Sequence, residues 1–381
     1  MSKYRFDQIA INSTAKKKPT EEDKYHYIGL EHIDSQNLIV SRWGSEIAPK
    51  GEKLLMKKGD VLFGKRRAYQ KKVAIAPFNG IFSAHGMVLR PNQEVIDKNF
   101  FPMFISSDYF LDAAIAISVG SLSPTINWKD LARLEFDLPS MEEQRKLAEV
   151  LWSVNDTLQA YQNLLTQTDA LVQAQFVEMF GDPIENTKKW EKHPLSELCE
   201  VITGNTPART HPEYYGDYIE WIKTDNITSD SVNLSRATES LSKKGATVGR
   251  IAPPCSILMT CIAGSLNTIG NIGITDRIVS FNQQINALVP YETNVWFLYQ
   301  LLKMIRPQIH TATNKALKCI LTKGNLSAIE IIAPDKNLQQ SFAMLMQQAN
   351  ASKATLQNTI TSLQATKRSI LDRALGTGRK E

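Results

Sequence analysis

The chain has 381 residues, of which 43% are hydrophobic and 22% are charged, and its net charge is +5. These values are typical of a globular protein long enough for two domains, and they exclude disorder of the whole chain. No segment approaches the roughly 18 apolar residues that span a bilayer, and the N-terminal residues lack the apolar core of a secretion signal. We therefore expect a soluble, cytoplasmic protein.

The first 140 residues are predicted to form one α+β domain. Short apolar runs bounded by turn residues indicate buried strands at 59–64, 72–77 and 85–91. A helical segment is predicted over 100–117. A polar loop containing Ser121 and Asn127 follows it, and a further strand ends before Pro139.

A basic cluster lies between the first two of these strands, where the sequence reads KRRAYQKK. Basic side chains bind the DNA backbone, and a nearby amide can read a base edge in the major groove. The alternative is a solvated hairpin tip with no ligand. The predicted DNA-binding residues are Lys65, Arg66, Arg67, Tyr69, Gln70, Lys71 and Lys72. Other candidates are the polar loop with Ser121 and Asn127 and, on weaker evidence, Lys16, Lys17 and Lys18.

A single long helix is predicted over 141–181. Ser140 and Glu143 form a capping-box pattern at its start, and Gly181 is a typical helix stop. About forty helical residues would extend roughly 60 Å. Apolar residues recur at alternating steps of three and four, the spacing of a coiled-coil seam. The predicted seam includes Leu147, Leu151, Val154, Leu158, Tyr161 and Leu165.

Residues 182–334 repeat the order of the first domain, with strands predicted at 255–260, 271–276 and 284–290 and a helical segment at 295–309. The segment that corresponds to the basic cluster is nearly uncharged. Polar side chains elsewhere are the candidates here, because Asn and Gln amides pair with adenine, although turn chemistry is the alternative. The predicted DNA-binding residues are Thr206, Arg209, Thr210, Lys223, Asn282, Gln283 and Gln284.

A second long helix is predicted over 335–376. Its seam is interrupted by Lys353 and Lys367, and its predicted packing residues are Phe342, Met346, Leu356, Ile360, Leu363 and Ile370. Residues 141–181 carry 2 Lys/Arg against 6 Asp/Glu, a net charge of −4, whereas residues 335–381 carry 7 against 3, a net charge of +4. Opposite charge favours pairing of the two helices, and an antiparallel arrangement would place the domains at opposite ends of a rod. The alternative is that each helix packs only on its own domain.

A constant offset of 195 residues relates the two halves of the chain. It runs from Leu122 on Leu317 to Gly181 on Gly376, and it matches the junction residues Pro139 and Gln144 with Pro334 and Gln339. A period this long is not a solenoid repeat. It indicates a duplicated module consisting of a domain and a helix.

The chain resembles the specificity subunits of type I restriction-modification systems. The resemblance covers almost the whole sequence and depends on GDVLFGKRRAYQKKVAIA in the first domain, GNTPARTHPEYYGDYIEWIKTDNI in the second, and the twice-used strand-Pro-x-x-x-x-Gln-helix junction. It implies two target recognition domains, each reading one half of a bipartite DNA target, with paired helices as the spacer. The second junction departs from the pattern, because it lacks the Glu-Gln pair present as Glu143-Gln144.

The resemblance also implies a non-catalytic protein without a cofactor or metal of its own. Its expected partners are double-stranded DNA, two modification methyltransferase subunits, and restriction endonuclease/translocase subunits. S-adenosylmethionine, ATP and Mg are expected on those partner subunits only.

Three other functions compete with this one. The chain could be a methyltransferase or nuclease itself, but no glycine-rich cofactor loop, HExxH motif or carboxylate-lysine cluster supports catalysis. It could be a two-domain scaffold for a partner other than DNA. It could also be the specificity subunit of another bipartite-site restriction system, whose partner fuses methyltransferase and nuclease.

Overall fold

The computed structural model describes residues 1–228, 231–315 and 318–376. Leu317, the predicted counterpart of Leu122, lies outside the described residues. The chain divides into two compact units, the first formed by Met1–Gln162 with Asn358–Glu381 and the second by Asn163–Gln357. This division cuts both long helices near their middles, so each unit contains half of each helix.

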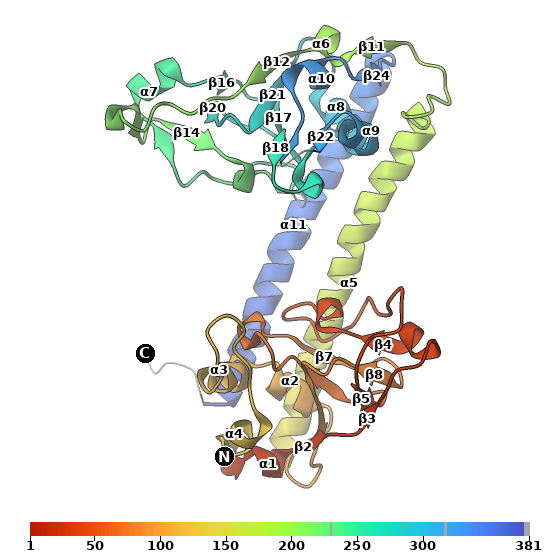
Figure 1. The fold of residues 1–381 in the computed structure, drawn as a ribbon, viewed down its shortest axis with the longest axis vertical. Helices are drawn as coiled ribbons and strands as arrows, with labels where there is room; N and C mark the ends of the chain where they lie inside the picture. Colours follow the sequence, from red (N-terminus) through yellow and green to blue (C-terminus); the bar gives the residue numbers. More distant parts are fainter. Residues whose placement is uncertain (229–230, 316–317, 377–381) are drawn as a thin grey trace. The chain divides into compact units, whose positions relative to one another are not determined.

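The first unit contains two four-stranded sheets, ordered β2-β9-β6-β7 and β3-β5-β8-β4, and the two-stranded sheet β1-β10. The strands are β1 Ser2–Arg5, β2 Ala10–Ser13, β3 Lys16–Lys17, β4 Tyr27–Ile28, β5 Lys53–Met56, β6 Val61–Phe63, β7 Val73–Ile75, β8 Gly80–Phe82, β9 Met87–Pro91 and β10 Glu135–Leu138. The three buried strands predicted before residue 91 are confirmed as β6, β7 and β9. Figure 1 shows these sheets together with α2 and α3 of the same unit.

Apart from its halves of the two long helices, the first unit contains only short helices among its described residues. They are α1 Phe6–Ile9, α2 Phe100–Ile105, α3 Asp108–Ala116 and α4 Trp128–Leu131, with 3-10 turns η1 Glu22–His26, η2 Leu30–His32 and η3 Ala68–Gln70. The prediction of one helical segment over 100–117 was wrong, because the chain breaks at Ser106 and Ser107. The Ser107 hydroxyl accepts a hydrogen bond from the Phe110 amide at 3.3 Å and so begins a new helix.

The second unit contains sheets ordered β12-β21-β17-β19, β13-β15-β14-β20-β16, β18-β23-β22 and β11-β24. The strands are β11 Lys192–Pro194, β12 Cys199–Thr203, β13 Tyr215–Gly216, β14 Ile219–Ile222, β15 Ser240–Leu241, β16 Ile251–Ala252, β17 Ile257–Thr260, β18 Ile262–Ala263, β19 Ile272–Ile274, β20 Val279–Phe281, β21 Ile285–Pro290, β22 Asn314–Lys315, β23 Cys319–Ile320 and β24 Glu330–Ile332. The shorter helices and turns are α6 Leu195–Leu198, α7 Lys243–Val248, α8 Val295–Met304, α9 Arg306–Thr311, α10 Lys323–Ser327, η4 Pro212–Tyr214, η5 Thr224–Asn226 and η6 Leu266–Thr268.

The two units repeat one topology. Antiparallel sheet β2-β9-β6-β7 has its counterpart in β12-β21-β17-β19, and the parallel pair β4-β8 has its counterpart in β14-β20. The helical segment predicted over 295–309 is also two helices, because Pro307 lies in the first turn of α9, where its missing N–H costs no helical hydrogen bond. The prediction of a duplicated α+β module is confirmed.

The long helices are α5 Met141–Phe180 and α11 Lys336–Ala374. The Glu143 carboxylate accepts a hydrogen bond from the Ser140 amide at 2.9 Å, as the capping-box pattern predicts. Gly181 and Gly376 follow the helix ends with φ of 78° and 72°, a conformation that glycine adopts without a Cβ clash. No helix within residues 1–228, 231–315 and 318–376 has the length and apolar content needed to cross a membrane.

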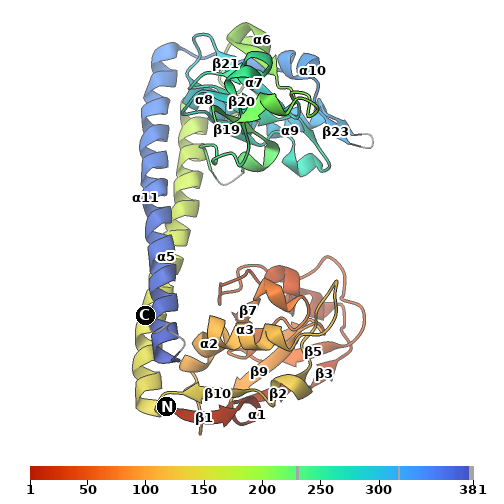
Figure 2. The same ribbon diagram turned by 90° about the vertical axis from the view of Figure 1, so that its left-hand side faces the viewer.

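The two helices run antiparallel where they pack against each other in each unit (Figure 2). In the first unit Leu147 and Leu151 of α5 share a core cluster with Ile370 and Leu371 of α11. In the second unit Phe176 of α5 contacts Phe342 of α11 edge-on, with ring centroids 5.4 Å apart. Every predicted seam residue is buried or half-buried. The helices therefore pack both on each other and on the domains, which combines the two arrangements considered from the sequence.

The two lysines that interrupt the seam of α11 both bond to α5. Lys353 donates to the Asp169 carboxylate at 2.6 Å in the second unit, and Lys367 donates to the Asn155 amide oxygen at 3.0 Å in the first. Burial lowers the pKa of Lys367 to about 8. Polar seam residues of this kind fix helix register, because any shift would leave a buried donor without its acceptor.

A glutamine joins each long helix to the domain that precedes it. Gln144, 1% exposed, accepts a hydrogen bond from the Asp97 amide at 2.8 Å and donates to the Pro139 carbonyl at 3.0 Å. Gln339, 5% exposed, accepts from the Asn294 amide at 3.0 Å and donates to the Pro334 carbonyl at 2.8 Å. Glutamine recurs at this junction for a structural reason. In each unit its side chain binds one backbone N–H of the domain and the carbonyl of the junction proline.

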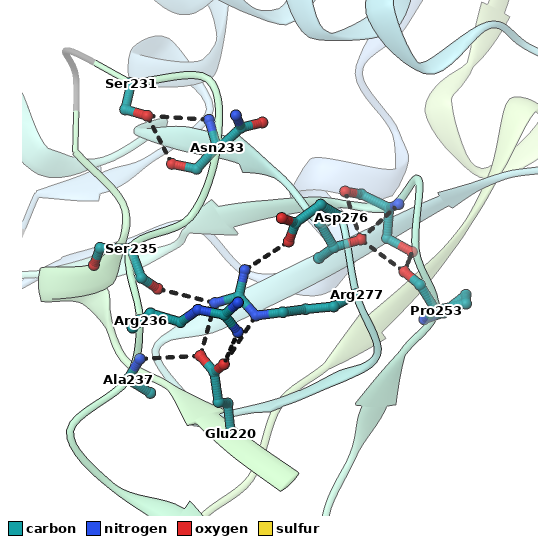
Figure 3. Close-up of polar contacts among 11 residues, drawn as sticks. Glu220, Ser231, Asn233, Ser235, Arg236, Ala237, Pro253, Asp276 and Arg277 are labelled. Atoms are coloured by element: carbon teal, nitrogen blue, oxygen red, sulfur yellow. Dashed lines mark hydrogen bonds and ion pairs between the residues drawn. The ribbon is translucent and has the colours of Figure 1, made fainter. Parts of the chain in front are cut away.

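In the second unit a carboxylate of the five-stranded sheet is bound by two arginines and a backbone amide (Figure 3). Glu220 of β14 accepts two hydrogen bonds from Arg277, at 3.0 and 2.7 Å, and one from Arg236 at 2.6 Å. The Ala237 amide donates to the same carboxylate at 3.0 Å. The bidentate Arg277 contact is the largest cause that lowers the pKa of Glu220 to about 2; burial opposes it, and the Ala237 and Arg236 donors add to it.

We predict that Gln144→Met destabilises the protein by about 1 to 3 kcal/mol, because the Asp97 amide and the Pro139 carbonyl lose their buried partner while the side-chain volume is retained. Urea unfolding followed by circular dichroism measures this difference. Gln348→Met, at an exposed position of α11, is the matched control and should leave the unfolding midpoint unchanged. Equal midpoints for the two variants would contradict the structural role of Gln144.

We also predict an acid-dependent loss of stability through Glu220. Its pKa in the folded state, about 2, lies below the ordinary value of 4.5, so its contribution is complete above pH 4.5 and disappears as the pH falls toward 2. Glu220→Gln should cost about 1 to 2 kcal/mol at pH 7, a value reduced for partial solvent screening, and the cost should shrink below pH 4.5. Asp276→Asn, at the more exposed partner of Arg277, should cost less. A pH-independent difference between wild type and Glu220→Gln would contradict this account.

Candidate nucleic-acid interface

Three backbone segments of the first unit pair side by side and form a ribbon. Residues 119 and 125 form a narrow hairpin, because the Val119 and Thr125 amides and carbonyls exchange hydrogen bonds of 3.0 and 2.9 Å. Arg66 forms an antiparallel bridge with Thr125, and the Arg67 amide donates to the Pro124 carbonyl at 2.8 Å. The basic segment after β6 and the polar loop after α3 are therefore hydrogen-bonded side by side, although about sixty residues separate them in the sequence.

The predicted basic cluster divides into two groups. Arg66, Arg67 and Tyr69 are exposed, and Lys65 and Gln70 are half-buried. By contrast, Lys71 donates to Asp108 at 2.6 Å and to Asp112 at 2.7 Å, and Lys72 donates to the Leu30 carbonyl at 2.6 Å. These contacts give Lys71 and Lys72 a structural role that their position in the basic run did not indicate.

The exposed group creates a positive local potential. Burial, and then the nearby charge of Lys16, lower the pKa of Lys65. Burial likewise lowers the pKa of His85, with further contributions from Arg66 and Lys65. Arg66 Nη1 lies 3.4 Å from His85 Nε2. Basic side chains gathered this closely would gain from a phosphate placed between them.

The weaker lysine candidates lie on or next to the short strand β3. Lys17 is paired with Asp23 at 2.9 Å, and Lys16 lies 3.7 Å from Glu52. Lys18 is exposed. Among these residues, Lys16 is close enough to the ribbon for its charge to lower the pKa of Lys65.

The second unit has an equivalent ribbon formed by β18, β22 and β23. Asn314 pairs with Ile320, which is the Val119–Thr125 pair displaced by the same 195 residues, and Ile262 pairs with Ile320 as Arg66 does with Thr125. Lys315 and Lys318 are exposed on this ribbon. Sequence reasoning missed both lysines, although the 195-residue offset already aligns Lys318 with Ser123, and extending it by two residues aligns Lys315 with Gly120 of the first hairpin.

A second polar cluster in the second unit surrounds Glu239. Arg209 contacts this carboxylate at 2.6 Å, and Lys223 also forms an ion pair with it. The Arg209 guanidinium lies over the Tyr215 ring, 4.2 Å from its centroid, and Lys223 lies 5.2 Å from the Trp221 ring. The hydrogen bond from Lys223, and then that from Arg209, lower the pKa of Glu239. The predicted residues Arg209 and Lys223 are thus brought together, but their charge is shared with one carboxylate.

The predicted amide cluster separates into inward and outward side chains. Asn282 is buried, and its side-chain oxygen accepts a hydrogen bond from the backbone N–H of Gln284 at 3.0 Å. Gln284 points back toward the Ile262 carbonyl at 3.5 Å. Gln283 is exposed and accepts a hydrogen bond from the Thr206 hydroxyl. Thr210 lies in an exposed turn. Turn chemistry therefore accounts for Asn282 and Gln284, whereas Thr206, Thr210 and Gln283 remain accessible to a ligand.

The family model that describes the type I restriction modification DNA specificity domain matches residues 7–167 and 187–364. The chain is 24% identical to the type I restriction enzyme HindI specificity subunit of Haemophilus influenzae, over 77% of this chain and 81% of that one. It is 20% identical to the putative type I restriction enzyme MjaX specificity subunit of Methanocaldococcus jannaschii, over 88% and 83% of the two chains.

Two solved structures share the fold. The type I restriction-modification system S subunit from M. genitalium superposes with a TM-score of 0.58 at 16% identity, over 98% of this chain and 96% of that one. A chain from work on complex assembly and conformational transition of the type I R-M system gives a TM-score of 0.54 at 20% identity, over 98% and 97% of the chains.

These matches confirm the resemblance inferred from the sequence, and they do not favour the other bipartite-site system. One model matches each half of the chain, in agreement with the two equivalent units. The chain belongs to the family of type I restriction-modification specificity subunits.

Proposed function

We propose that this chain directs a type I restriction-modification complex to a bipartite DNA sequence, with one half-site read by each unit. The observation that carries this proposal is the repetition of one ribbon at equivalent positions of the two units. Different side chains occupy it: Arg66 and Arg67 in the first unit, Lys315 and Lys318 in the second. A shared backbone with different side chains suits two readers of two different sequences.

The proposed half-site contacts come from the accessible members of each predicted set. In the first unit these are Arg66, Arg67, Tyr69 and the half-buried Lys65 and Gln70. In the second they are Arg209, Thr206, Thr210 and Gln283, with Lys315 and Lys318 added by the fold. Arginine and lysine hold phosphates, whereas amides and arginine read base edges.

The proposed complex supplies all of the chemistry from its other subunits. Two modification methyltransferase subunits would methylate adenine with S-adenosylmethionine, and restriction endonuclease/translocase subunits would use ATP and Mg. The chain itself would be non-catalytic and cytoplasmic. Mapping methylated adenines across the genome with and without this chain tests the proposal, because loss of one bipartite motif is expected and an unchanged pattern would contradict it.

The long helices are proposed to set the gap between the half-sites. α5 and α11 each continue from one unit into the other as one helix. The lysine contacts to Asp169 and Asn155 hold their register in both halves. A stiff element of fixed register suits a protein that must match the separation and the helical phase of two DNA segments.

We predict that removing the basic pair from the first ribbon weakens binding to all sequences and flattens its salt dependence. For Arg66→Ala with Arg67→Ala, the slope of log K against log salt should decrease in magnitude by about 1.8, which is about 0.9 for each phosphate that the variant no longer neutralises. Fluorescence anisotropy of the assembled complex on duplex DNA measures the slope. Lys57→Ala with Lys58→Ala removes two exposed charges from the same unit and should leave the slope near the wild-type value. Equal slopes for the two double variants would exclude the ribbon as a phosphate-binding element.

We predict that deleting one heptad from each helix, residues 160–166 and 355–361, changes the preferred gap without changing either half-site. Seven residues shorten a helix by about 10.5 Å, which corresponds to roughly three base pairs. Affinity should also fall, because three base pairs turn the DNA by roughly 100° while a heptad deletion hardly turns the helix. Selection from DNA with random spacers measures the gap. An unchanged gap preference would refute the spacer function.

A further inference from the structure

An apolar side chain stands at the tip of the first ribbon. Leu122 is 92% exposed, and it lies between Ser121 and Ser123 in the loop that connects residues 119 and 125. A single exposed leucine is common on protein surfaces and carries no argument alone. The position of this one, in the turn that closes the hairpin of a basic ribbon, is what requires an explanation.

Backbone hydrogen bonds hold the tip in place. The Val119–Thr125 pair closes the hairpin with bonds of 3.0 and 2.9 Å, and the Thr125 hydroxyl donates to the Ser123 carbonyl at 3.1 Å. Gly120 has a φ of 114°, which a side chain would disfavour. Leu122 is therefore presented by an ordered turn, so a contact that it makes would cost little ordering of the loop.

Positive charge surrounds the stem of the same hairpin. Arg66 pairs with Thr125, the Arg67 amide donates to the Pro124 carbonyl at 2.8 Å, and the Ile126 amide donates to the Lys65 carbonyl at 2.9 Å. These three basic residues suit a phosphate backbone on either side of the ribbon. The charge selects DNA as the occupant of this surface, and Leu122 would then be the exposed apolar side chain that the ribbon presents to it.

Leucine can read only one feature of the major groove. The hairpin that carries Leu122 has two arms, and a two-stranded β-ribbon fits this groove. Each base edge there presents donors, acceptors or, for thymine alone, a 5-methyl group. Because leucine has neither donor nor acceptor, it complements the methyl group and nothing else on those edges. We propose that Leu122 recognises the 5-methyl group of one thymine in the half-site read by the first unit. This inference rests on the proposed function.

The test removes the methyl group from the DNA and the leucine from the protein. Each thymine of the mapped target, in either strand of the first half-site, is replaced singly by deoxyuridine, and the affinity of the assembled complex is measured. Wild type should bind about fourfold more weakly at one position, the effect of about one buried methyl group. Leu122→Ala should show no loss at that position, and Leu122→Met, which keeps an apolar contact, should retain the discrimination.

Two controls keep the outcome specific. Ile47→Ala removes an aliphatic side chain that is 69% exposed in the same unit, and this variant should discriminate thymine from deoxyuridine as wild type does. Leu122→Ala should keep the wild-type melting temperature and assembly, because its side chain is exposed. Loss of folding or assembly would instead assign Leu122 a structural or subunit contact and overturn the proposal.

The remaining outcomes separate this inference from the proposed function. If the complex binds its target no better than scrambled DNA, the proposed function fails and this inference fails with it. If specific binding persists but no deoxyuridine position depends on Leu122, only the thymine contact is excluded. Increased 2-aminopurine fluorescence next to the ribbon, without methyl dependence, would mean that Leu122 unstacks bases, which also overturns the methyl contact.

Discussion

The antiparallel contact of α5 with α11, present in both units, is the constraint on which the rest of this structure depends. Each half of the contact is apolar at its core, with Leu151 beside Leu371 in the first unit and Phe176 beside Phe342 in the second. An apolar seam alone tolerates sliding, because one leucine can replace another. The bonds of Lys353 to Asp169 and of Lys367 to Asn155 remove that tolerance. Lys367 is held where burial opposes its charge, so the seam gives up some stability for a single register.

The junction between domain and helix transmits that register to each domain. Gln144 and Gln339 bond to a backbone amide from the preceding domain and to the proline carbonyl that ends the last strand. The second junction lacks the Glu143 counterpart, yet its glutamine makes the same bonds. The glutamate caps the first helix through Ser140, whereas at the second helix the Asp335 side chain accepts from the Asn337 amide at 2.8 Å. Capping is therefore interchangeable between residue types, but the junction amide is not.

Much of this fold follows from the sequence, because apolar runs, turn residues and the 195-residue offset are local or repetitive signals. Strands β6, β7, β9, β17, β19 and β21 and both long helices are predictable on that basis. The partner that each polar side chain contacts was less predictable. Lys71 and Arg66 belong to one basic run, but only the fold shows that Asp108 and Asp112 neutralise Lys71. Lys315 and Lys318 were missed because the charge lies on different segments of the two ribbons. The basic run of the first unit is the segment that flanks the hairpin, whereas the second unit carries its lysines in the hairpin itself.

Under the proposed function, this difference in which ribbon segment carries the charge lets one fold serve two recognition tasks. The pairs Val119–Thr125 and Asn314–Ile320 fix the ribbon through backbone atoms, so the ribbon depends little on the side chains that project from it. Most core residues lie in the sheets and against the long helices, although Ala263 and Cys319 of the second ribbon also pack against the core. Substitutions at the exposed ribbon positions therefore change what is contacted without disturbing packing, whereas substitutions at the seam or junction change stability and register. Because these two sets of residues are separate, the proposed target contacts can vary while the helix contacts within each unit are kept.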